Sequence, residues 1–480
     1  MSDDVVGLGA VQLAAAIRAR RLSCVEVISA YLDRIDLLNP QFNAIVSLRG
    51  RAELLAEARA RDAQLARGEP EGRLYGLPHA VKDLALTRGL RTTSGSPLLD
   101  AVPTSDAIFV ERVRHHGAIL IGKTNTPEFG LGSQTYNAVF GTTLNAYDRT
   151  RTAGGSSGGA AAALALRLLP VADGSDMMGS LRNPAAYNNV LGFRPSFGRV
   201  PASGEELFLE QLGVLGPMGR TIEDLVLLLD VMAGPDPRAP LSLDDADWRT
   251  RGPLQCAVAG TRIGWLGDLG GQLPFEAGVL ELCRTACTVF ESLGCRVEEL
   301  RLPVAPAELW KAWTTLRSWL VAGALAVLFA DPGKRAQLKP EARWEIERGL
   351  ALGAMDVYRA SAVRSRWYLA ALRLFERVDF LLLPSAQVFP FAADQDWPRS
   401  IAGTVMDTYH RWMEVVVPAS LLGAPVLNLP AGFDARGLPM GVQLIGPPRA
   451  DWSVLRLGAA YEQATDWVRR RPPPILGART

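Results

Sequence analysis

The sequence predicts an α/β fold with a mostly parallel or mixed β-sheet. Strand-like apolar segments alternate with helical segments from about residue 70 onward, and this alternation is typical of a sheet covered by helices. The chain has 480 residues, of which 48% are hydrophobic and 21% are charged. That composition argues against disorder and allows a sizeable core, and the length fits one large α/β domain or two ordinary ones.

Helices are expected over the first seventy residues. Ser23 and Glu26 have the spacing of a capping box, and apolar residues at helical spacing follow between Val25 and Ile35. The Asn39–Pro40 pair is expected to end this helix. A second helix, rich in alanine, leucine and arginine, is predicted over residues 51–67.

The remaining elements follow in order along the chain. Short apolar runs predict strands over residues 77–81, 118–121, 262–266, 296–302 and 380–383. Helices are predicted over residues 106–116 and 160–169, and a long, mostly helical stretch is expected from about residue 306 to 378.

Charge and composition argue against several classes of protein. The 51 basic residues balance 50 acidic ones, so neither nucleic acid nor an anionic membrane is expected as a main partner. The longest uninterrupted apolar run, Trp319–Ala330, has 12 residues and is too short to span a bilayer. The acidic N-terminus lacks the pattern of a signal peptide, and the five cysteines have no metal-site spacing. A cytoplasmic protein without a metal site is therefore expected.

Histidine and lysine are both scarce in this chain. Four histidines must supply any Ser-His-Asp triad or histidine metal site. Only five of the 51 basic residues are lysines, so a lysine retained in an apolar stretch calls for an explanation.

Lys82 is such a lysine, because it ends the apolar segment that begins at Gly76 and precedes Asp83. A lysine in water has a pKa near 10.4 and is a poor base at pH 7. Burial can lower that pKa by up to about 3–5 units, and a neutral lysine can deprotonate a serine. A salt bridge to Asp83 or to another acid explains this segment, taken alone, equally well.

The segment 154–159 supplies two candidate serines, Ser156 and Ser157, among four glycines. An alanine-rich helix follows, and its N-terminus favours an anion or a developing negative charge. A phosphate cradle or a plain linker has the same composition. The segment is not a P-loop, because no Gly-Lys-Ser/Thr follows.

The segment 173–184 supplies a third candidate, Ser180, which follows Met177–Gly179. Consecutive backbone amides at this point could form an oxyanion hole. A helix N-cap is an equally good explanation of Ser180 from this segment alone.

Together these segments resemble the amidase signature family of serine hydrolases. The resemblance runs through residues 76–83, 122–129, 154–159, 173–186 and 192–195, and through the C-terminal residues 423–425 and 437–446. Ser156 and Ser180 lie 24 residues apart, as in this family. The motifs occur in the same order and cover most of the chain, with the middle third the least distinctive.

The resemblance implies a Ser–Ser–Lys triad without a metal or cofactor. Lys82 would be the general base, Ser156 the bridging serine after a cis peptide bond, and Ser180 the nucleophile that forms an acyl-enzyme. The implied oxyanion hole consists of the amides of Met177, Met178, Gly179 and Ser180. The residues implied to brace the site are Ser157, Asp176 and Arg182. The residues implied to bind the substrate are Gly130, Leu131, Gly132, Met178 and Asn183.

The resemblance also implies one large domain over residues 1–480, with a large mixed, mostly parallel sheet covered by helices on both faces. Within it, residues 1–70 are the N-terminal helices and 71–235 the catalytic core. Residues 255–378 are a variable, largely helical region on the substrate side, and residues 379–480 return to the core.

The expected substrate follows from the departures from the family pattern. Met178 stands where a glycine is usual, and seven of the 11 tryptophans lie between residues 310 and 412. These features predict a roomy apolar cleft in a stand-alone hydrolase of uncharged aryl or alkyl amides or carbamates (urethanes). Its partner would be the small-molecule substrate, without nucleic acid or membrane, and it would be a monomer or homodimer.

Two alternatives differ from this reading. The chain could be the ammonia-releasing A-type subunit of a tRNA-dependent amidotransferase complex, which uses the same chemistry. It could also be a catalytically silent binding module on this fold, although the presence of Lys82, Ser156 and Ser180 disfavours that alternative.

Overall fold

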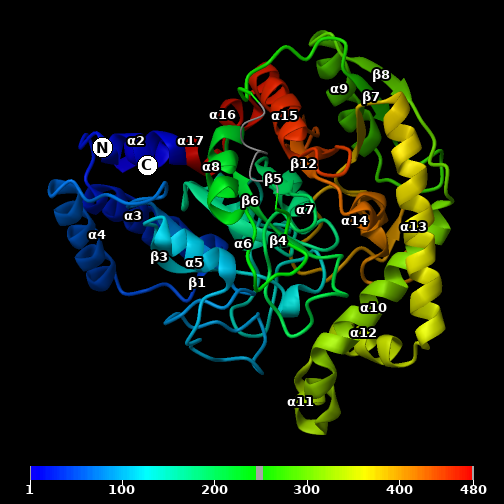
Figure 1. Ribbon diagram of the computed structural model, residues 1–480, viewed down its shortest axis with the longest axis horizontal. Coiled ribbons are helices and arrows are strands. Elements are labelled where there is room, and N and C mark those ends of the chain that lie inside the picture. Colours follow the sequence, from blue (N-terminus) through cyan, green and yellow to red (C-terminus); the bar gives the residue numbers. More distant parts are fainter. Residues whose placement is uncertain (1, 245–251, 478–480) are drawn as a thin grey trace.

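The computed structural model describes residues 2–244 and 252–477. Its largest sheet has eight strands (Figure 1), in the spatial order β4–β6–β5–β12–β13–β9–β7–β8. In that order the strands are β4 (Val171–Asp176), β6 (Val214–Gly219), β5 (Leu191–Arg194), β12 (Val426–Phe433), β13 (Pro439–Ile445), β9 (Phe380–Pro384), β7 (Arg262–Trp265) and β8 (Arg296–Glu299). The predicted strands over residues 262–266, 296–302 and 380–383 are thus present as β7, β8 and β9.

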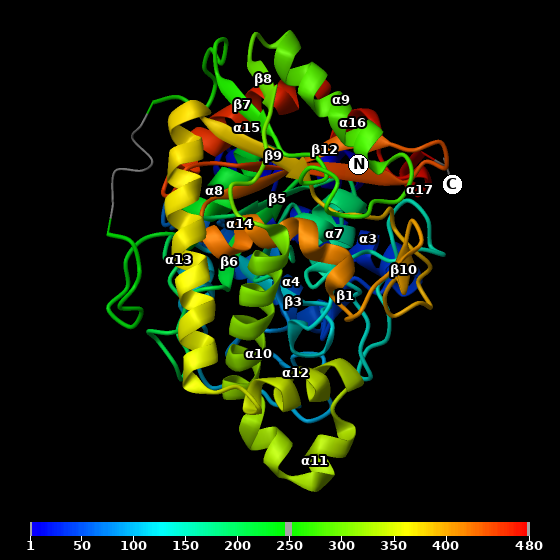
Figure 2. The ribbon, with the colours of Figure 1, turned by 90° about the vertical axis from the view of Figure 1, so that its right-hand side faces the viewer.

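Helices cover this sheet, so the predicted mixed α/β fold is confirmed. In Figure 2, α9 and α15 lie above strands β9 and β12, while α7 and α14 lie below them. The helices that contact the strands or lie beside them are α6 (Gly158–Ala165), α7 (Arg182–Tyr187), α8 (Ile222–Met232), α9 (Val279–Ser292), α14 (Val417–Leu422) and α15 (Asp451–Thr465).

The strand pairing differs from the expected, mostly parallel arrangement. Neighbouring strands from β4 to β9 pair antiparallel, whereas the pairs β9–β7 and β7–β8 are parallel. The turn over residues 434–438 joins β12 to β13, and it is too short for a crossover helix, so these strands form a hairpin. Alternation of strands and helices elsewhere in the sequence does not reveal such a hairpin.

A smaller sheet carries the segment that ends in Lys82. Its strands are β1 (Ile45–Val46), β3 (Ile119–Thr124) and β2 (Pro78–Lys82), with β3 in the middle. β2 runs parallel to β3 and places Lys82 opposite Thr124, while β1 pairs antiparallel with β3. The strands β10 (Ser400–Ile401) and β11 (Thr404–Val405) form a separate two-stranded pair.

The N-terminal helices confirm one prediction and correct another. Ser23 Oγ accepts a hydrogen bond from the Glu26 amide at 3.1 Å, and the Glu26 carboxylate accepts one from the Ser23 amide at 2.8 Å, which completes the capping box. Pro40 does not end the helix, which continues to Phe42. Asn43 ends it instead in a left-handed conformation, with its amide donating to the Asn39 carbonyl. The helices of this part are α1 (Ser2–Gly7), α2 (Ala10–Arg18), α3 (Cys24–Phe42), α4 (Arg51–Ala66) and α5 (Ile108–His115).

The predicted helical stretch from residue 306 to 378 consists of four helices. They are α10 (Pro306–Ala330), α11 (Pro332–Gln337), α12 (Pro340–Leu350) and α13 (Ala354–Arg377), and α10 packs against both α12 and α13. α10 is long and apolar enough to cross a membrane, but half of its most apolar window is buried inside the molecule. α10 thus packs some of its residues into the core and leaves others exposed.

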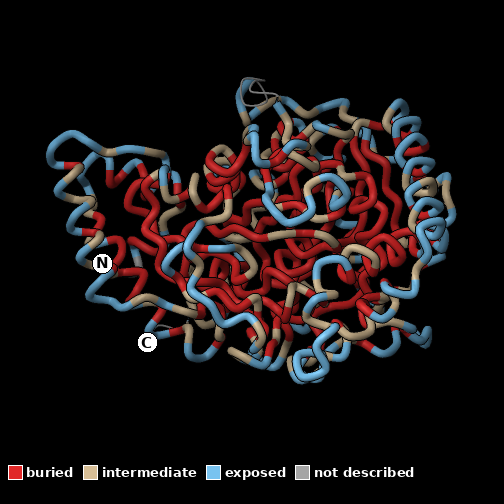
Figure 3. Tube along the Cα trace, turned by 60° about the horizontal axis from the view of Figure 1, so that its bottom comes forward, coloured by how far each residue is buried: buried red, intermediate tan, exposed pale blue. Residues whose placement is uncertain are grey.

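The core is continuous across these layers. One cluster of buried apolar side chains extends from Val5 in α1 to Tyr461 in α15. Figure 3 shows the buried residues concentrated in the middle of the molecule and the exposed ones along its outline. The short elements that complete the described chain are the 3₁₀-helices η1 (Glu128–Gly130) and η3 (Arg411–Val416) and the helices α16 (Trp467–Arg470) and α17 (Pro474–Gly477).

Candidate active site

Lys82 is the last residue of β2, and its side chain is buried. Its Nζ donates hydrogen bonds to Ser156 Oγ at 2.8 Å, to Ser157 Oγ at 2.9 Å and to Ser175 Oγ at 2.9 Å. The carboxylate of Asp83 instead accepts hydrogen bonds from the Thr93 hydroxyl and amide. The lysine is therefore surrounded by serine hydroxyls and does not form the salt bridge to Asp83 that the sequence left open.

Burial lowers the pKa of Lys82 to about 7, because surroundings of low polarity disfavour the charged ammonium. Asp173 and Asp176 act in the opposite direction and keep the pKa from falling further. The Asp173 carboxylate also accepts hydrogen bonds from the Lys82 amide and contacts His79 Nε2 at 2.9 Å. A pKa near neutrality gives Lys82 a substantial population of the free amine at pH 7, which a general base requires.

Ser156 and Ser157 enter the site from the loop before α6. The Gly155–Ser156 peptide bond is cis, as the family resemblance implied. Gly158 begins α6 so close to Thr135 that a Cβ there would lie 2.3 Å from Thr135 Oγ1. Thr135 Oγ1 donates a hydrogen bond to the carbonyl that precedes Gly155, at 2.8 Å, and so holds the loop in place.

Asp176 ends β4 and organises the loop that carries Ser180. Its carboxylate accepts hydrogen bonds from the amides of Gly179 at 2.9 Å and Leu181 at 3.1 Å. Gly179 is one of the four residues whose amides were implied to form the oxyanion hole. Its amide already donates to Asp176. The loop around Ser180 is therefore wrapped around a buried carboxylate.

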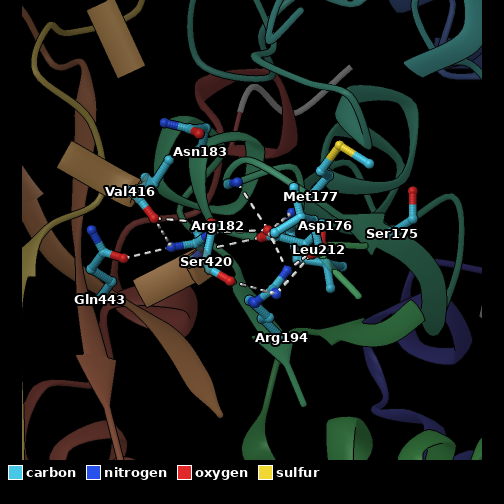
Figure 4. Close-up of polar contacts among 12 residues, drawn as sticks. Ser175, Asp176, Met177, Arg182, Asn183, Arg194, Leu212, Val416, Ser420 and Gln443 are labelled. Carbon is cyan, nitrogen blue, oxygen red and sulfur yellow. Dashed lines mark hydrogen bonds and ion pairs between the residues drawn. The ribbon is translucent and has the colours of Figure 1, made fainter. Parts of the chain in front are cut away.

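Arg182 joins this loop to the C-terminal part of the chain (Figure 4). It contacts Asp176 at 2.9 Å, Gln443 Oε1 on β13 at 2.7 Å and Ser420 Oγ on α14 at 2.8 Å. Arg194 approaches the same carboxylate at 3.1 Å. Burial alone would raise the pKa of Asp176, but the two guanidinium groups outweigh it and hold that pKa well below its usual range. Asp176 therefore stays charged and keeps the loop fixed.

Gly179 adopts a left-handed conformation with a φ of 81°. A Cβ at this position would lie 2.1 Å from Asn183 Oδ1, so a side chain has no room there. Asn183 itself is buried, and its Nδ2 donates a hydrogen bond to the Ser385 carbonyl at 2.7 Å. Ser180 follows Gly179 and reaches the surface of a cavity.

This cavity has a volume of about 520 Å³, and both Ser156 and Ser180 line it. Of the residues implied to bind the substrate, four line the cavity, namely Gly130, Leu131, Gly132 and Met178. Asn183 does not line it, because its side chain faces Ser385 instead. Within the described residues, no group of three or more histidine, cysteine or acidic side chains could hold a metal ion.

Sequence reasoning missed two groups near this cavity. Ser175 lies two residues after Asp173 on β4, so the alternation of a strand could have placed both on the face toward Lys82. Arg317 on α10 also lines the cavity. Its sequence neighbourhood is apolar and lies 137 residues from Ser180, so no motif pointed to it. The sequence had predicted an apolar cleft. Arg317 shows that the cleft also contains a cation.

The profile of the Amidase family matches residues 26–455. The chain belongs to the amidase family. It is accordingly an enzyme of the class that acts on the C–N bonds of amides, and the family resemblance stated from its motifs is confirmed.

Comparison with individual proteins shows which members of the family this chain is similar to. The chain is 39% identical to the A-type subunit of glutamyl-tRNA(Gln) amidotransferase from Thermus thermophilus, over 96% of this chain and 99% of that one. A crystal structure of a bacterial aryl acylamidase of the amidase signature family superimposes with a TM-score of 0.91 at 29% identity, covering 98% of this chain and 99% of that one. The structure of the amidotransferase A-type subunit from Thermotoga maritima superimposes with a TM-score of 0.72 at 26% identity, covering 92% of this chain and 95% of that one.

These relatives contradict two expectations from the sequence. The curated relatives at 33–39% identity over nearly the whole chain are named as one component of an amidotransferase for glutamyl-tRNA(Gln). A stand-alone hydrolase of uncharged amides or carbamates, and a partner set limited to a small molecule without nucleic acid, are therefore both overturned. The physical reason for the error is that the motifs encode the shared amide chemistry, whereas net charge reports only on direct, nonspecific binding of nucleic acid.

Proposed function

We propose that this chain is the ammonia-releasing subunit of a tRNA-dependent amidotransferase and works in the cytoplasm. The observation that carries the proposal is the 39% identity to an amidotransferase A-type subunit over nearly the full length of both chains. The contact between Lys82 Nζ and Ser156 Oγ at 2.8 Å, with Ser156 and Ser180 lining one cavity, supports it because a base that activates a serine nucleophile can cleave an amide and release ammonia.

In the proposed first half-reaction, Ser180 Oγ attacks the amide carbon of the donor. The Ser180 proton passes through Ser156 to the free amine of Lys82. Backbone amides of the loop before Ser180 stabilise the negative charge that develops on the amide oxygen. When the C–N bond breaks, Lys82 returns the proton through Ser156 to the leaving nitrogen, which departs as ammonia.

The second half-reaction regenerates the enzyme. Water attacks the ester formed on Ser180, with Lys82 again accepting a proton through Ser156. The ester bond breaks, Lys82 returns the proton through Ser156 to Ser180 Oγ, and the acid form of the donor leaves. Asp176 and Arg182 do not take part in these transfers, and in this proposal they hold the loop in the reactive geometry.

The proposal assigns the RNA contacts chiefly to partner proteins of the assembly. The chain has a net charge of +1, whereas direct binding of RNA phosphates draws on clustered lysine and arginine. A chain that only releases ammonia has no need for such a surface. The ammonia released at Ser180 would then be consumed by a separate protein of the assembly on the aminoacylated tRNA.

An ammonia bypass tests this proposal. The tagged chain is isolated with its bound partner proteins from its own cells, and conversion of Glu-tRNA(Gln) to Gln-tRNA(Gln) is measured with glutamine or with ammonium chloride as nitrogen source. The intact assembly should use both sources, and an assembly that carries Ser180→Ala should use ammonium chloride alone. The proposal is overturned if the isolated chain brings no amidation activity with either nitrogen source, or if Ser180→Ala leaves the glutamine-dependent reaction intact.

A further inference from the structure

Arg317 brings a buried cation to the cavity from outside the family motifs. It lies on α10, has only 4% of its surface exposed, and lines the same cavity as Ser156 and Ser180. A charge at this depth is retained only where partners or a ligand compensate it. The hydrogen-bond partners of its three nitrogens therefore show which part of the cation is available to a ligand.

Two of these nitrogens hold the guanidinium in one orientation. Nε donates to Glu345 Oε1 at 2.7 Å, and Nη2 donates to the Tyr409 hydroxyl at 2.8 Å. Glu345 also accepts hydrogen bonds from Ser318 Oγ at 2.6 Å and from the Tyr409 hydroxyl at 2.9 Å. The Trp313 ring lies against the guanidinium, 5.1 Å from its central carbon. The guanidinium plane is thus fixed by groups of α10, α12 and the segment before η3.

The third nitrogen, Nη1, has a much weaker partner. Its hydrogen bond within the described part of the chain runs to Met177 Sδ at 3.2 Å, and a thioether is a weak acceptor. Met177 belongs to the loop that carries Ser180, three residues before it, and also lines the cavity. Among the described residues, Nη1 therefore has no oxygen acceptor on the side of the cavity that Ser180 also lines, although arginine is best matched by a carboxylate.

We propose that Arg317 Nη1 anchors a carboxylate of the substrate, which assigns to this cavity amides that carry a carboxylate away from the scissile bond. The anchor rests on the proposed function only for the amide chemistry at Ser180. Met177 covers Nη1, and its flexible side chain moves aside when the carboxylate binds. Side-chain amides of amino acids have this combination of groups, whereas simple alkyl and aryl amides lack it.

The family motifs do not contain this anchor. The arginine that follows Ser180 in its motif, Arg182, is already bonded to Asp176, Gln443 and Ser420. Arg317 provides a positive group from α10 instead, held by Glu345. The role proposed for Arg317 is specificity, and the proton transfers at Ser180 do not involve it.

Binding to an inert enzyme tests the anchor without relying on turnover. In the Ser180→Ala background, calorimetry measures the Kd of glutaramate, an amide with a carboxylate, and of butyramide, a neutral amide of similar length. Glutaramate should bind at least 10-fold more tightly than butyramide. Adding Arg317→Lys, which keeps a cation for Glu345 but loses the fork, should weaken glutaramate binding about 10–100-fold and leave butyramide within about threefold.

A second variant controls for misfolding, which an unpaired Glu345 carboxylate could cause if Arg317 alone were changed. The double change Arg317→Gln with Glu345→Gln removes both charges, and it should weaken glutaramate as Arg317→Lys does. The matched control is Arg366→Gln with Glu308→Gln, which removes an exposed ion pair between α13 and α10 and should change neither Kd.

The outcomes separate this inference from the proposed function. Glutaramate binding no tighter than butyramide binding, or equal losses for both ligands in the Arg317 variants, would overturn the anchor and leave a merely structural role. Neither result bears on tRNA amidation, which the ammonia bypass measures separately. Conversely, selective loss of glutaramate binding would support the anchor even if no tRNA amidation were found.

Discussion

The Nζ of Lys82 and the Oγ of Ser156 lie 2.8 Å apart in a buried site. The two residues are 74 positions apart in sequence, one at the end of a strand of the small sheet and the other before α6. The contact joins the small sheet to the loop before α6 at the point where the chemistry is proposed to occur. Because a lysine must be uncharged to accept a proton, the pH dependence of activity reports on the charge state of Lys82.

Activity should rise with pH through an apparent pKa near 7. The pKa of Lys82 is lowered to about 7 by burial, so the ammonium that predominates below this pH cannot accept the proton of a serine. Above it the free amine predominates and the rate levels off. The pH profile of kcat/KM for amide hydrolysis measures this rise.

Lys82→Ala should remove the rise and lower kcat by several orders of magnitude. Lys334→Ala, a change at an exposed lysine of α11, provides the control and should keep the wild-type profile. A Lys82→Ala profile that still rose through the same pKa would exclude the lysine as the base.

Ser180→Ala should abolish covalent labelling by a fluorophosphonate and reduce turnover by several orders of magnitude, because the acyl-enzyme can no longer form. The fold should remain intact, as measured by circular dichroism and thermal unfolding. Ser365→Ala, on α13, is the matched control and should label like the wild type. Full labelling of the Ser180→Ala protein would show that the nucleophile lies elsewhere.

Asp176→Asn should destabilise the protein by about 3–5 kcal/mol, because it leaves the buried Arg182 and Arg194 without their counter-charge. The measurement is the free energy of unfolding in urea at pH 7. Asp394→Asn, at an exposed carboxylate outside the helices and strands, should change it by less than about 0.5 kcal/mol.

The same carboxylate should make stability fall in acid. The pKa of Asp176 is lower in the folded protein than in the unfolded chain, so its contribution is fully present above the unfolded pKa of about 3.9. It is lost as pH falls through the lower, folded value. The difference in unfolding free energy between wild type and Asp176→Asn should therefore shrink below about pH 4, and a constant difference would argue against this linkage.

Gly130→Ala should lower kcat more than Gly132→Ala does. Both glycines have positive φ values, of 70° and 94°, so both alanines carry a similar backbone cost of about 1–2 kcal/mol. Only the Cβ at Gly130 would reach the site, where it would clash with Leu84 Cδ1 at 2.9 Å and touch Ser156 Oγ at 3.5 Å. Unfolding free energies that match, together with a kcat at least about 10-fold lower for Gly130→Ala, are the expected result, and equal kcat values would contradict it.

The sequence by itself determined several of the elements and the candidate chemical groups. The capping box at Ser23, the strand that ends at Lys82 and the glycine loop before α6 were all predictable, because each depends on neighbours within a few residues. The three residues proposed to act in catalysis were identified through the resemblance of their motifs to the amidase signature family. Each motif is a short, continuous segment, so the sequence alone displays it.

Only the tertiary structure decided which distant groups meet. Arg182 contacts Ser420 and Gln443 more than 230 residues away, and Arg317 reaches the cavity of Ser180 from α10. No periodicity or motif records such contacts, because they depend on how α10, α14 and β13 pack on the core. The mostly antiparallel pairing of the large sheet has the same origin, since pairing is set by short connections and packing. Local sequence therefore specified the reacting groups, and long-range packing specified the polar framework around them and the cation in the cleft.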